Sequence, residues 1–212
     1  TVGVSIVAGD TKVIEGSGGL LINTTGIGVI PEERDVSAAN CMPGDKIILS
    51  GTLGDHHACI LSSRMEIENS ITSDCACLSD ITDSLFSRNI KVRTMRDVTR
   101  GGLGTILNEI AESSRCGIEI REDALPIKDE VKGFSDILGL DPMYMGNEGK
   151  MIVVVPPDQA ETALEVVKET DNGRDAAIIG EVREGTGTIL RTHLGGSRKI
   201  DVLYGEGLPR IC

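Results

Sequence analysis

Residues 91–111 read KVRTMRDVTRGGLGTILNEIA, and this stretch decides the fold class of the chain. Residues 91–95 predict a β-strand that runs into a glycine-rich turn at 96–104. The residues beyond predict an amphipathic helix, because apolar side chains recur at helical spacing. These side chains are Leu103, Ile106, Leu107, Ile110 and Ala111. A strand, a glycine-rich turn and a helix in this order can cradle a phosphate group.

The turn carries residues that suit a phosphate pocket. Asp97, Thr99 and Arg100 precede Gly101 and Gly102. The pattern matches neither G-x-G-x-x-G nor the lysine-containing P-loop. The alternative is an ordinary capped helix, in which Asp97 or Thr99 accepts hydrogen bonds from the free amides. Asp97 and Arg100 together exceed what a cap requires, which favours a phosphate pocket.

Strands and helices alternate through most of the chain, which predicts an α/β (α+β) fold. The expected strands are residues 45–49, 118–120, 151–155, 176–182 and 188–191. The expected helices are 74–89, 127–138, 158–170 and one that carries His56, His57, Ile60 and Leu61. Residues 151–155 are continuously apolar, which indicates a central strand of a covered sheet. We expect residues 184–187 to join the last two strands as a hairpin, and residues 193–199 to form a loop. Asp158 is expected to cap the helix at 158–170, and Phe134 to point into the core.

The N-terminal region predicts two further strands and a possible phosphate turn. Residues 2–7 and 20–30 are rich in β-formers, and residues 31–43 read as a connector. Between the strands, Asp10, Thr11 and Lys12 follow Gly9. Aspartate is a hard oxygen ligand for a divalent cation and lysine a point charge for phosphate. An ordinary connecting turn is the alternative.

Two other glycine-containing turns are candidates for binding or catalysis. Residues 50–55 open a helix and could hold an anion, whereas His56 and His57 point in different directions and make a poor metal pair. We expect a capping or phosphate-side role for one of them. Glu148 lies between Gly146 and Gly149, where it is either a general base or a solvated turn carboxylate.

The chain ends in the sequence Tyr204-Gly-Glu-Gly-Leu-Pro-Arg-Ile-Cys212. Glycine permits φ > 0 and proline removes a backbone donor, so regular structure is disfavoured. We expect an extended, movable arm with a thiol nucleophile, Cys212, at its tip. A frayed terminus with an incidental cysteine is the alternative.

Composition excludes several classes of function. The 212 residues carry 33 acidic and 21 basic side chains, a net charge of −12, which argues against a nucleic-acid or anionic-membrane surface. Only two Phe, two Tyr and no Trp are present, so base stacking is disfavoured. Without an apolar leader or a membrane-length apolar run, the six cysteines indicate a cytoplasmic protein with reduced thiols. The start in mid-strand suggests that a longer protein has lost its front.

Five motifs together resemble the HypE family of hydrogenase maturation proteins, in the ATP-binding superfamily of aminoimidazole ribonucleotide synthetase and selenophosphate synthetase. They are residues 9–13, 23–28, 51–56, 97–102 and 209–212, of which the terminal Pro-Arg-Ile-Cys is the most specific. The resemblance covers essentially the whole chain. It implies a remnant of the N-terminal ATP-binding domain at 1–37, a C-terminal α/β domain at 38–192 and a flexible tail at 193–212.

The resemblance also implies an activity, the ATP-dependent dehydration of an S-carbamoyl group on Cys212 to an S-cyano group. The cyanide then becomes a ligand of the iron in a nickel–iron hydrogenase. Implied cofactors are ATP and Mg²⁺; implied partners are the carbamoyltransferase HypF, the HypC–HypD iron scaffold and, at full length, a second copy. Carried over residue by residue, the implied roles are catalysis for Cys212, Lys12 and Glu148, ATP binding for Asp10, Thr11, Asp97, Thr99, Arg100, Gly101 and Gly102, and Mg²⁺ binding for Asp10.

Two other functions stay open. Without the family's N-terminal half, the chain could be a carrier that presents Cys212 to partners and turns over no ATP. Selenophosphate or purine synthetase-like chemistry on small molecules is disfavoured, because neither reaction needs a terminal cysteine.

Overall fold

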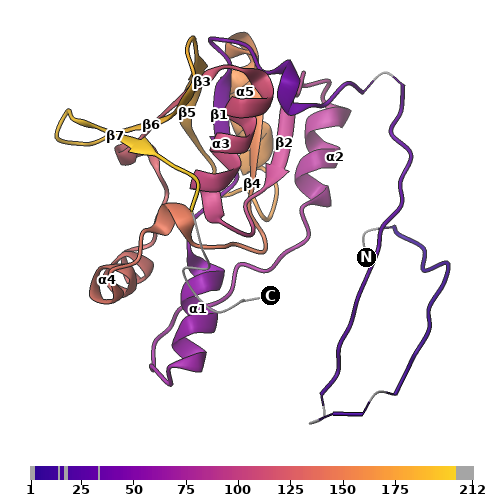
Figure 1. Ribbon diagram of the computed structural model, residues 1–212. Helices are drawn as coiled ribbons and strands as arrows, with labels where there is room; N and C mark the ends of the chain where they lie inside the picture. Colours follow the sequence, from indigo (N-terminus) through magenta and orange to yellow (C-terminus); the bar gives the residue numbers. More distant parts are fainter. Residues whose placement is uncertain (1–2, 14, 17–18, 33, 204–212) are drawn as a thin grey trace. The chain divides into compact units, whose positions relative to one another are not determined.

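The computed structural model describes residues 3–13, 15–16, 19–32 and 34–203. The chain divides into two units, Thr1–Asp35 and Val36–Cys212. The second unit is built around one sheet (Figure 1). Among the described residues, no helix has the length and apolar character needed to cross a membrane.

The second unit contains a seven-stranded mixed sheet, and this confirms the predicted α/β fold. The strand order is β2-β4-β1-β5-β3-β6-β7, and all neighbours are antiparallel except β3 and β6. The strands are β1 Lys46–Leu49, β2 Thr94–Asp97, β3 Gly117–Arg121, β4 Met151–Val155, β5 Ala177–Arg183, β6 Gly187–Arg191 and β7 Ser197–Ile200. The α-helices are α1 Asp55–Arg64, α2 Ser79–Ser87, α3 Gly102–Ser114, α4 Asp129–Leu138 and α5 Ala160–Lys168. Short 3₁₀ turns are η1 Ala38–Asn40, η2 Glu122–Ala124, η3 Pro142–Tyr144 and η4 Pro157–Gln159.

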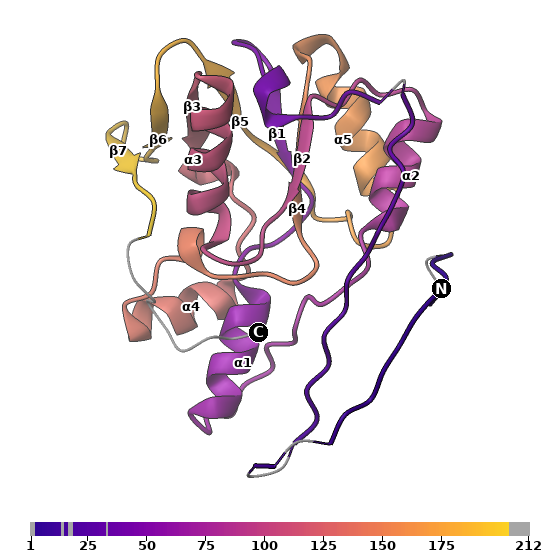
Figure 2. The ribbon, with the colours of Figure 1, turned by 45° about the vertical axis from the view of Figure 1, so that its right-hand side comes forward.

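Helices cover the sheet on both faces. α3 packs on one face, and α2 and α5 pack on the other (Figure 2). β4 shows why its sequence is continuously apolar: Ile152 and Val154 face α3, whereas Met151, Val153 and Val155 face α2 and α5. All five side chains are buried, as expected for a strand covered on both sides.

A smaller apolar cluster joins α1 to α4. Ala58 and Leu61 of α1 pack with Val131 and Phe134 of α4 and with Met145. The two helices lie side by side below the sheet in Figure 1. Phe134 is buried, which confirms the prediction that it points inward.

The last three strands differ from their prediction. β5 and β6 do not form a hairpin, because β3 lies between them and pairs with both. The connection passes close to β3 at Gly117, where a Cβ atom would lie 3.2 Å from the Glu184 carbonyl oxygen. Part of the expected loop 193–199 is strand β7, which pairs with β6, and its Ile200 is fully buried. A regular strand thus occupies part of the region expected to be a flexible tail.

Two helix starts were also predicted wrongly. α5 begins at Ala160 after the turn η4, and its N-terminus has no side-chain cap, so Asp158 is not the capping residue. α2 begins at Ser79 instead of residue 74. The backbone of residues 74–76 packs against Gly149, where a Cβ would lie 1.8 Å from the Asp74 carbonyl oxygen. This close contact holds the segment in a non-helical course.

The first unit contains no strand or helix within its described residues, so the strands expected at 2–7 and 20–30 are absent there. Their apolar side chains are exposed, for example Ile6 at 94% and Ile27 at 97%. A β-strand forms only where a neighbouring strand takes up its backbone hydrogen bonds. Sequence propensity alone therefore does not produce strands in these residues.

Candidate active site

Three loops meet at one edge of the sheet, where β1 and β2 end and β4 begins. Leu49 pairs with Ile152, and Asp97 pairs with Met151, which places these strand ends next to each other. The loops are residues 50–54, 98–101 and 145–150. Two of the predicted site motifs, the Asp97–Gly102 turn and the turn that carries Glu148, therefore lie at the same edge.

Asn147 joins the three loops. Its side chain is fully buried, and its Oδ1 accepts a hydrogen bond from the Gly54 N–H at 2.8 Å. Its backbone N–H and its Nδ2 both donate to the Val98 carbonyl, each at 3.0 Å. Nδ2 also donates to the Met145 carbonyl at 3.1 Å. One amide side chain thus satisfies buried polar groups from all three loops.

The glycines of the Asp97–Gly102 turn permit close packing. Gly101 and Gly102 both have positive φ, at +77° and +63°. A Cβ at Gly102 would lie 2.6 Å from the Met143 carbonyl oxygen, so only glycine lets η3 sit against the start of α3. No side chain caps α3, because the Thr99 hydroxyl donates to the Asp97 carboxylate at 2.8 Å. The alternative prediction, a cap from Asp97 or Thr99, is therefore wrong.

The start of α1 argues against the anion site expected at residues 50–55. The Gly54 N–H is already bonded to Asn147. Asp55 brings a buried carboxylate into the first helical turn, where it accepts a hydrogen bond from Thr52 and lies 2.9 Å from the Lys128 Nζ. A negative charge at this helix end disfavours a second anion.

The two adjacent histidines have different environments. His57 is buried, and its Nδ1 accepts a hydrogen bond from the Gly146 N–H at 3.3 Å. Burial, with a smaller contribution from His56, lowers the pKa of His57 to about 4, so the ring is neutral at pH 7. The His56 Nδ1 lies 2.8 Å from the Ser73 Oγ. Neither ring caps the helix, and both support neighbouring loops.

Glu148 is half-buried in the turn that precedes β4. Its backbone N–H donates to the Asp74 Oδ1 at 2.9 Å. The neighbouring Gly146 approaches the other turn, since a Cβ there would lie 3.2 Å from the Thr99 carbonyl oxygen. The turn that carries Glu148 is therefore held between the Asp97–Gly102 turn and the segment that contains Asp74.

The remaining predicted residues lie elsewhere in the chain. Asp10, Thr11 and Lys12 are exposed in the first unit, where the Lys12 Nζ is 3.8 Å from the Asp10 carboxylate. Cys212 lies outside the described residues. Arg100 is exposed and Thr99 half-buried beside Gly101 in the second unit. The roles proposed for these residues stay predictions.

Sequence reasoning missed Asn147, Asp74 and the buried Asp55. Asn147 had a usable signal, because asparagine between glycines is typical of a tight turn. Asp74 had none, because its partner Glu148 lies far along the chain. Asp55 has a local partner in Thr52, but its ion-pair partner Lys128 is distant in the sequence.

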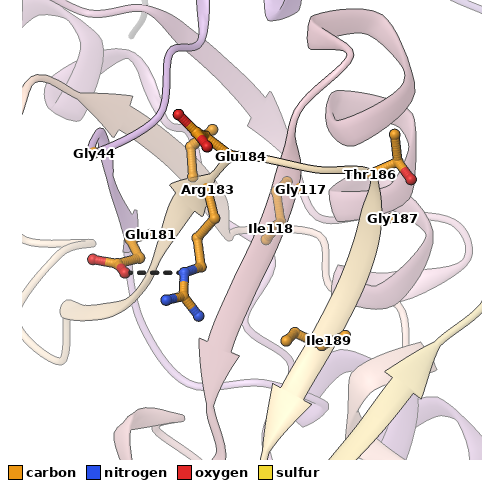
Figure 3. A pocket seen from close by; sticks show the side chains of 10 residues that line it. Gly44, Gly117, Ile118, Glu181, Arg183, Glu184, Thr186, Gly187 and Ile189 are labelled. Carbon is orange, nitrogen blue, oxygen red and sulfur yellow. Dashed lines mark ion pairs between the residues drawn. The ribbon is translucent and has the colours of Figure 1, made fainter.

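A separate cavity of about 440 Å³ opens at the other end of the sheet (Figure 3). It is lined by the start of β3 and the end of β5, including Gly117, Glu181 and Arg183. The Arg183 Nε lies 3.6 Å from the Glu181 carboxylate. None of the predicted site residues lines it.

The family described as "AIR synthase related protein, C-terminal domain" matches residues 42–193. The chain is 45% identical to carbamoyl dehydratase HypE of Rhodobacter capsulatus in an alignment of length 217, which covers 99% of this chain and 64% of that protein. It therefore spans just under two thirds of that relative's length.

Solved structures show the same similarity. The Escherichia coli hydrogenase maturation protein HypE superposes with a TM-score of 0.83 at 41% identity, covering 87% of this chain and 58% of that one. A HypE structure in complex with ATP superposes with a TM-score of 0.80 at 39% identity, covering 84% of this chain and 55% of that one. A chain of a HypE–HypF complex superposes with a TM-score of 0.77 at 40% identity, covering 80% of this chain and 56% of that one.

Proposed function

The chain belongs to the AIR synthase related family and is a homologue of HypE, and on that premise we propose that it is an ATP-dependent carbamoyl dehydratase of nickel–iron hydrogenase maturation. The observation that carries the proposal is the 45% identity to a carbamoyl dehydratase over 99% of this chain. The reaction would convert an S-carbamoyl group on Cys212 into an S-cyano group. The cyanide would then become a ligand of the hydrogenase iron.

The chemistry explains why ATP is needed. An amide oxygen is a poor leaving group, so dehydration requires that the oxygen first be converted into a phosphate ester. ATP supplies this phosphoryl group. The C–O bond then breaks with loss of phosphate, and the nitrogen loses its protons as the C≡N bond forms. The protein has to hold the carbamoyl group near the phosphate and keep water out.

Three residues would act on the S-carbamoyl group. Cys212 is the carrier, and its glycine- and proline-containing segment suits an arm that visits several sites. Glu148 is the base that removes a proton from nitrogen, and its half-buried position at the sheet edge leaves it accessible to a ligand. Lys12 positions the group and supplies a positive charge.

The phosphates of ATP would be held at the start of α3. This helix has no acidic residue in its first turn and no side-chain cap, which suits an anion. Thr99 and Arg100 would add a hydroxyl and a positive charge, and Asp97, Gly101 and Gly102 of the same turn would line the phosphate site. We also propose that Asp10 and Thr11 bind ATP, and that Asp10 provides one of the few carboxylates that Mg²⁺ needs beside phosphate.

The proposed partners and location follow from the homologues. The HypE–HypF structure supports a carbamoyltransferase of the HypF type as donor. We propose the HypC–HypD iron scaffold as acceptor, a cytoplasmic location, and a homodimer at full length. The domains proposed are 1–37, 38–192 and the segment 193–212, of which the strand β7 completes the sheet of the second domain.

Mass spectrometry of the chain tests the proposal directly. The protein is incubated with a HypF-type carbamoyltransferase, carbamoyl phosphate and Mg-ATP, beside a Cys212→Ala control. We expect a carboxamide on Cys212 that subsequently loses one water, and no modification in the control. Absence of any modification at Cys212, under conditions in which full-length HypE is modified, would refute the carrier role.

The second candidate function is a carrier that turns over no ATP. It is favoured by the glycine- and proline-containing segment that ends in Cys212, which suits a carrier arm. In the same experiment this function predicts a carboxamide on Cys212 that persists in the presence of Mg-ATP.

A further inference from the structure

Asp74 contacts the backbone of the proposed base. Its Oδ1 accepts the Glu148 N–H at 2.9 Å, although the two residues lie 74 positions apart in the sequence. Its Oδ2 is buried and has no hydrogen-bond partner among the described residues. One carboxylate oxygen of Asp74 thus accepts a hydrogen bond from the turn that carries Glu148.

The segment around Asp74 is itself fixed. Gly149 follows Glu148, and its lack of a side chain lets the backbone of residues 74–76 pack directly against it. On the other side, the Ser73 Oγ lies 2.8 Å from the His56 Nδ1 and accepts a hydrogen bond from the Cys75 N–H at 3.1 Å. Asp74 therefore lies in a segment that contacts both Gly149, next to Glu148, and His56 of α1.

Several charged groups surround Asp74. Burial raises the pKa of Asp74, while the Glu148 N–H and then the positive charge of Lys150 act in the opposite direction. Asp55 raises this pKa further, and His56 lowers it. The Asp74 carboxylate thus belongs to a small cluster of charged groups at the sheet edge. Its hydrogen bond, however, is to the backbone N–H of Glu148.

We propose that Asp74 is a positioning residue for Glu148, which fixes the turn 146–149 so that the Glu148 carboxylate faces the S-carbamoyl group. The proposal rests on the function proposed above for Glu148. A general base acts only within hydrogen-bond reach of the proton it removes, and a displacement of about 1 Å lowers rates by up to about 100-fold. Asp74 touches no reacting atom and acts through the Glu148 backbone alone.

The first test compares Asp74→Ala, which loses the acceptor, with Asp74→Asn, which keeps it. Asp83→Ala on the exposed side of α2 is the matched control. Under single-turnover conditions at saturating Mg-ATP, we expect Asp74→Ala to slow the loss of water from carbamoylated Cys212 by 10- to 100-fold. Asp74→Asn and the control should stay within about threefold of wild type, with unchanged ATP dependence and unchanged carbamoylation. Equal rates in Asp74→Ala and wild type would overturn the proposal.

A double mutant separates positioning from a general structural effect. If Asp74 acts only through Glu148, then Asp74→Ala has no further effect on dehydration in a Glu148→Gln background. A further rate loss of similar size in that background would contradict the proposal.

Amide hydrogen exchange measured by NMR gives a readout that needs no turnover. We expect the Glu148 N–H to be protected in wild type and Asp74→Asn, and to exchange at least tenfold faster in Asp74→Ala, with distant amides unchanged. Unchanged protection in Asp74→Ala would overturn the positioning role. If wild type shows no dehydration, the proposed function fails for this chain, and the exchange result alone decides the role of Asp74.

Discussion

At Cys77, local hydrogen bonds change the chemistry of an exposed side chain. The Ser79 hydroxyl lies 3.2 Å from the sulfur, and hydrogen bonds from the Ser79 side chain and then its backbone lower the pKa of the thiol. Cys41 is the opposite case, because burial raises the pKa of its thiol to about 12. The thiolate is the reactive form of cysteine. The neighbourhood of each cysteine therefore sets its reactivity.

We predict that iodoacetamide alkylates Cys77 faster than Cys75 in the native protein at pH 7, and that Cys41 does not react until the protein unfolds. Replacing Ser79 by Ala removes one of the hydrogen bonds and should slow Cys77 alkylation severalfold. Time-resolved peptide mass spectrometry measures all three rates. Equal rates at Cys75 and Cys77 would show that the Ser79 contact has no effect on reactivity.

His57 gives the protein a pH dependence at the residue scale. Its pKa is about 4 when folded and about 6.5 when unfolded. Between pH 4 and pH 6.5 the unfolded chain binds more protons at His57 than the folded chain does. The contribution of His57 to the free energy of unfolding is therefore fully present above pH 6.5, and it is lost as the pH drops towards 4.

We predict that His57 contributes about 2 kcal/mol to the loss of stability between pH 7 and pH 5. Urea unfolding of wild type and of His57→Gln at both pH values measures this contribution. It is the difference between the two proteins in how much the free energy of unfolding falls from pH 7 to pH 5. The variant should be less stable at pH 7 but less sensitive to acid. An unchanged pH slope in His57→Gln would mean that another group is responsible.

At the scale of elements, the packing of η3 on α3 depends on glycine. A Cβ at Gly102 would collide with main-chain atoms of Met143 and Tyr144, which cannot rotate away. Gly104 likewise makes room for the Tyr144 ring, which would lie 2.7 Å from a Cβ there. Gly102 and Gly104 therefore allow α3 to pack against η3, independently of any ligand that the turn binds.

We predict that Gly102→Ala destabilises the protein by more than about 2 kcal/mol, because φ is positive and the contact is with backbone. Gly133→Ala in α4 is the matched control, since no atom lies within 4 Å of its Cβ position. The control should stabilise by about 0.5–1 kcal/mol through helix propensity. Chemical denaturation measures both, and a Gly102→Ala variant as stable as wild type would contradict the packing described here.

At the scale of the whole molecule, β7 extends the sheet from a region expected to be a loop. Its Ile200 belongs to the same core as α3, β1 and β4, and the Asn108 Nδ2 donates to the Ile200 carbonyl at 3.0 Å. The second unit thus reaches at least to residue 200, beyond the proposed domain boundary at 192.

We predict that Ile200→Ala costs about 2–5 kcal/mol of stability, the range for large-to-small changes in a core. Leu194→Ala is the control, because Leu194 is 86% exposed and should change stability by less than about 0.5 kcal/mol. Thermal or denaturant unfolding distinguishes the two. If both variants match wild type, β7 contributes nothing to the core.

Local patterns in the sequence determined the fold class, the apolar face of α3, the buried strand β4 and the turns that carry Asp97 and Glu148. These features depend on residues a few positions apart, because helices and strands impose short periods on their side chains. Asn147, between glycines, was predictable as a turn residue, but its three loop contacts were not.

Only the tertiary structure decided the strand order, the strand β7, and the contacts of Asp74 and Asn147. β3 separates β5 from β6, and Asp74 meets Glu148, through pairings between segments distant in the chain. Such pairings depend on which backbone and side-chain groups can satisfy each other once the core has formed, and no local pattern encodes that choice. Local patterns in the sequence therefore determined most of the helices and strands of the second unit, and tertiary packing decided which of them meet and that Ser197–Ile200 form a strand.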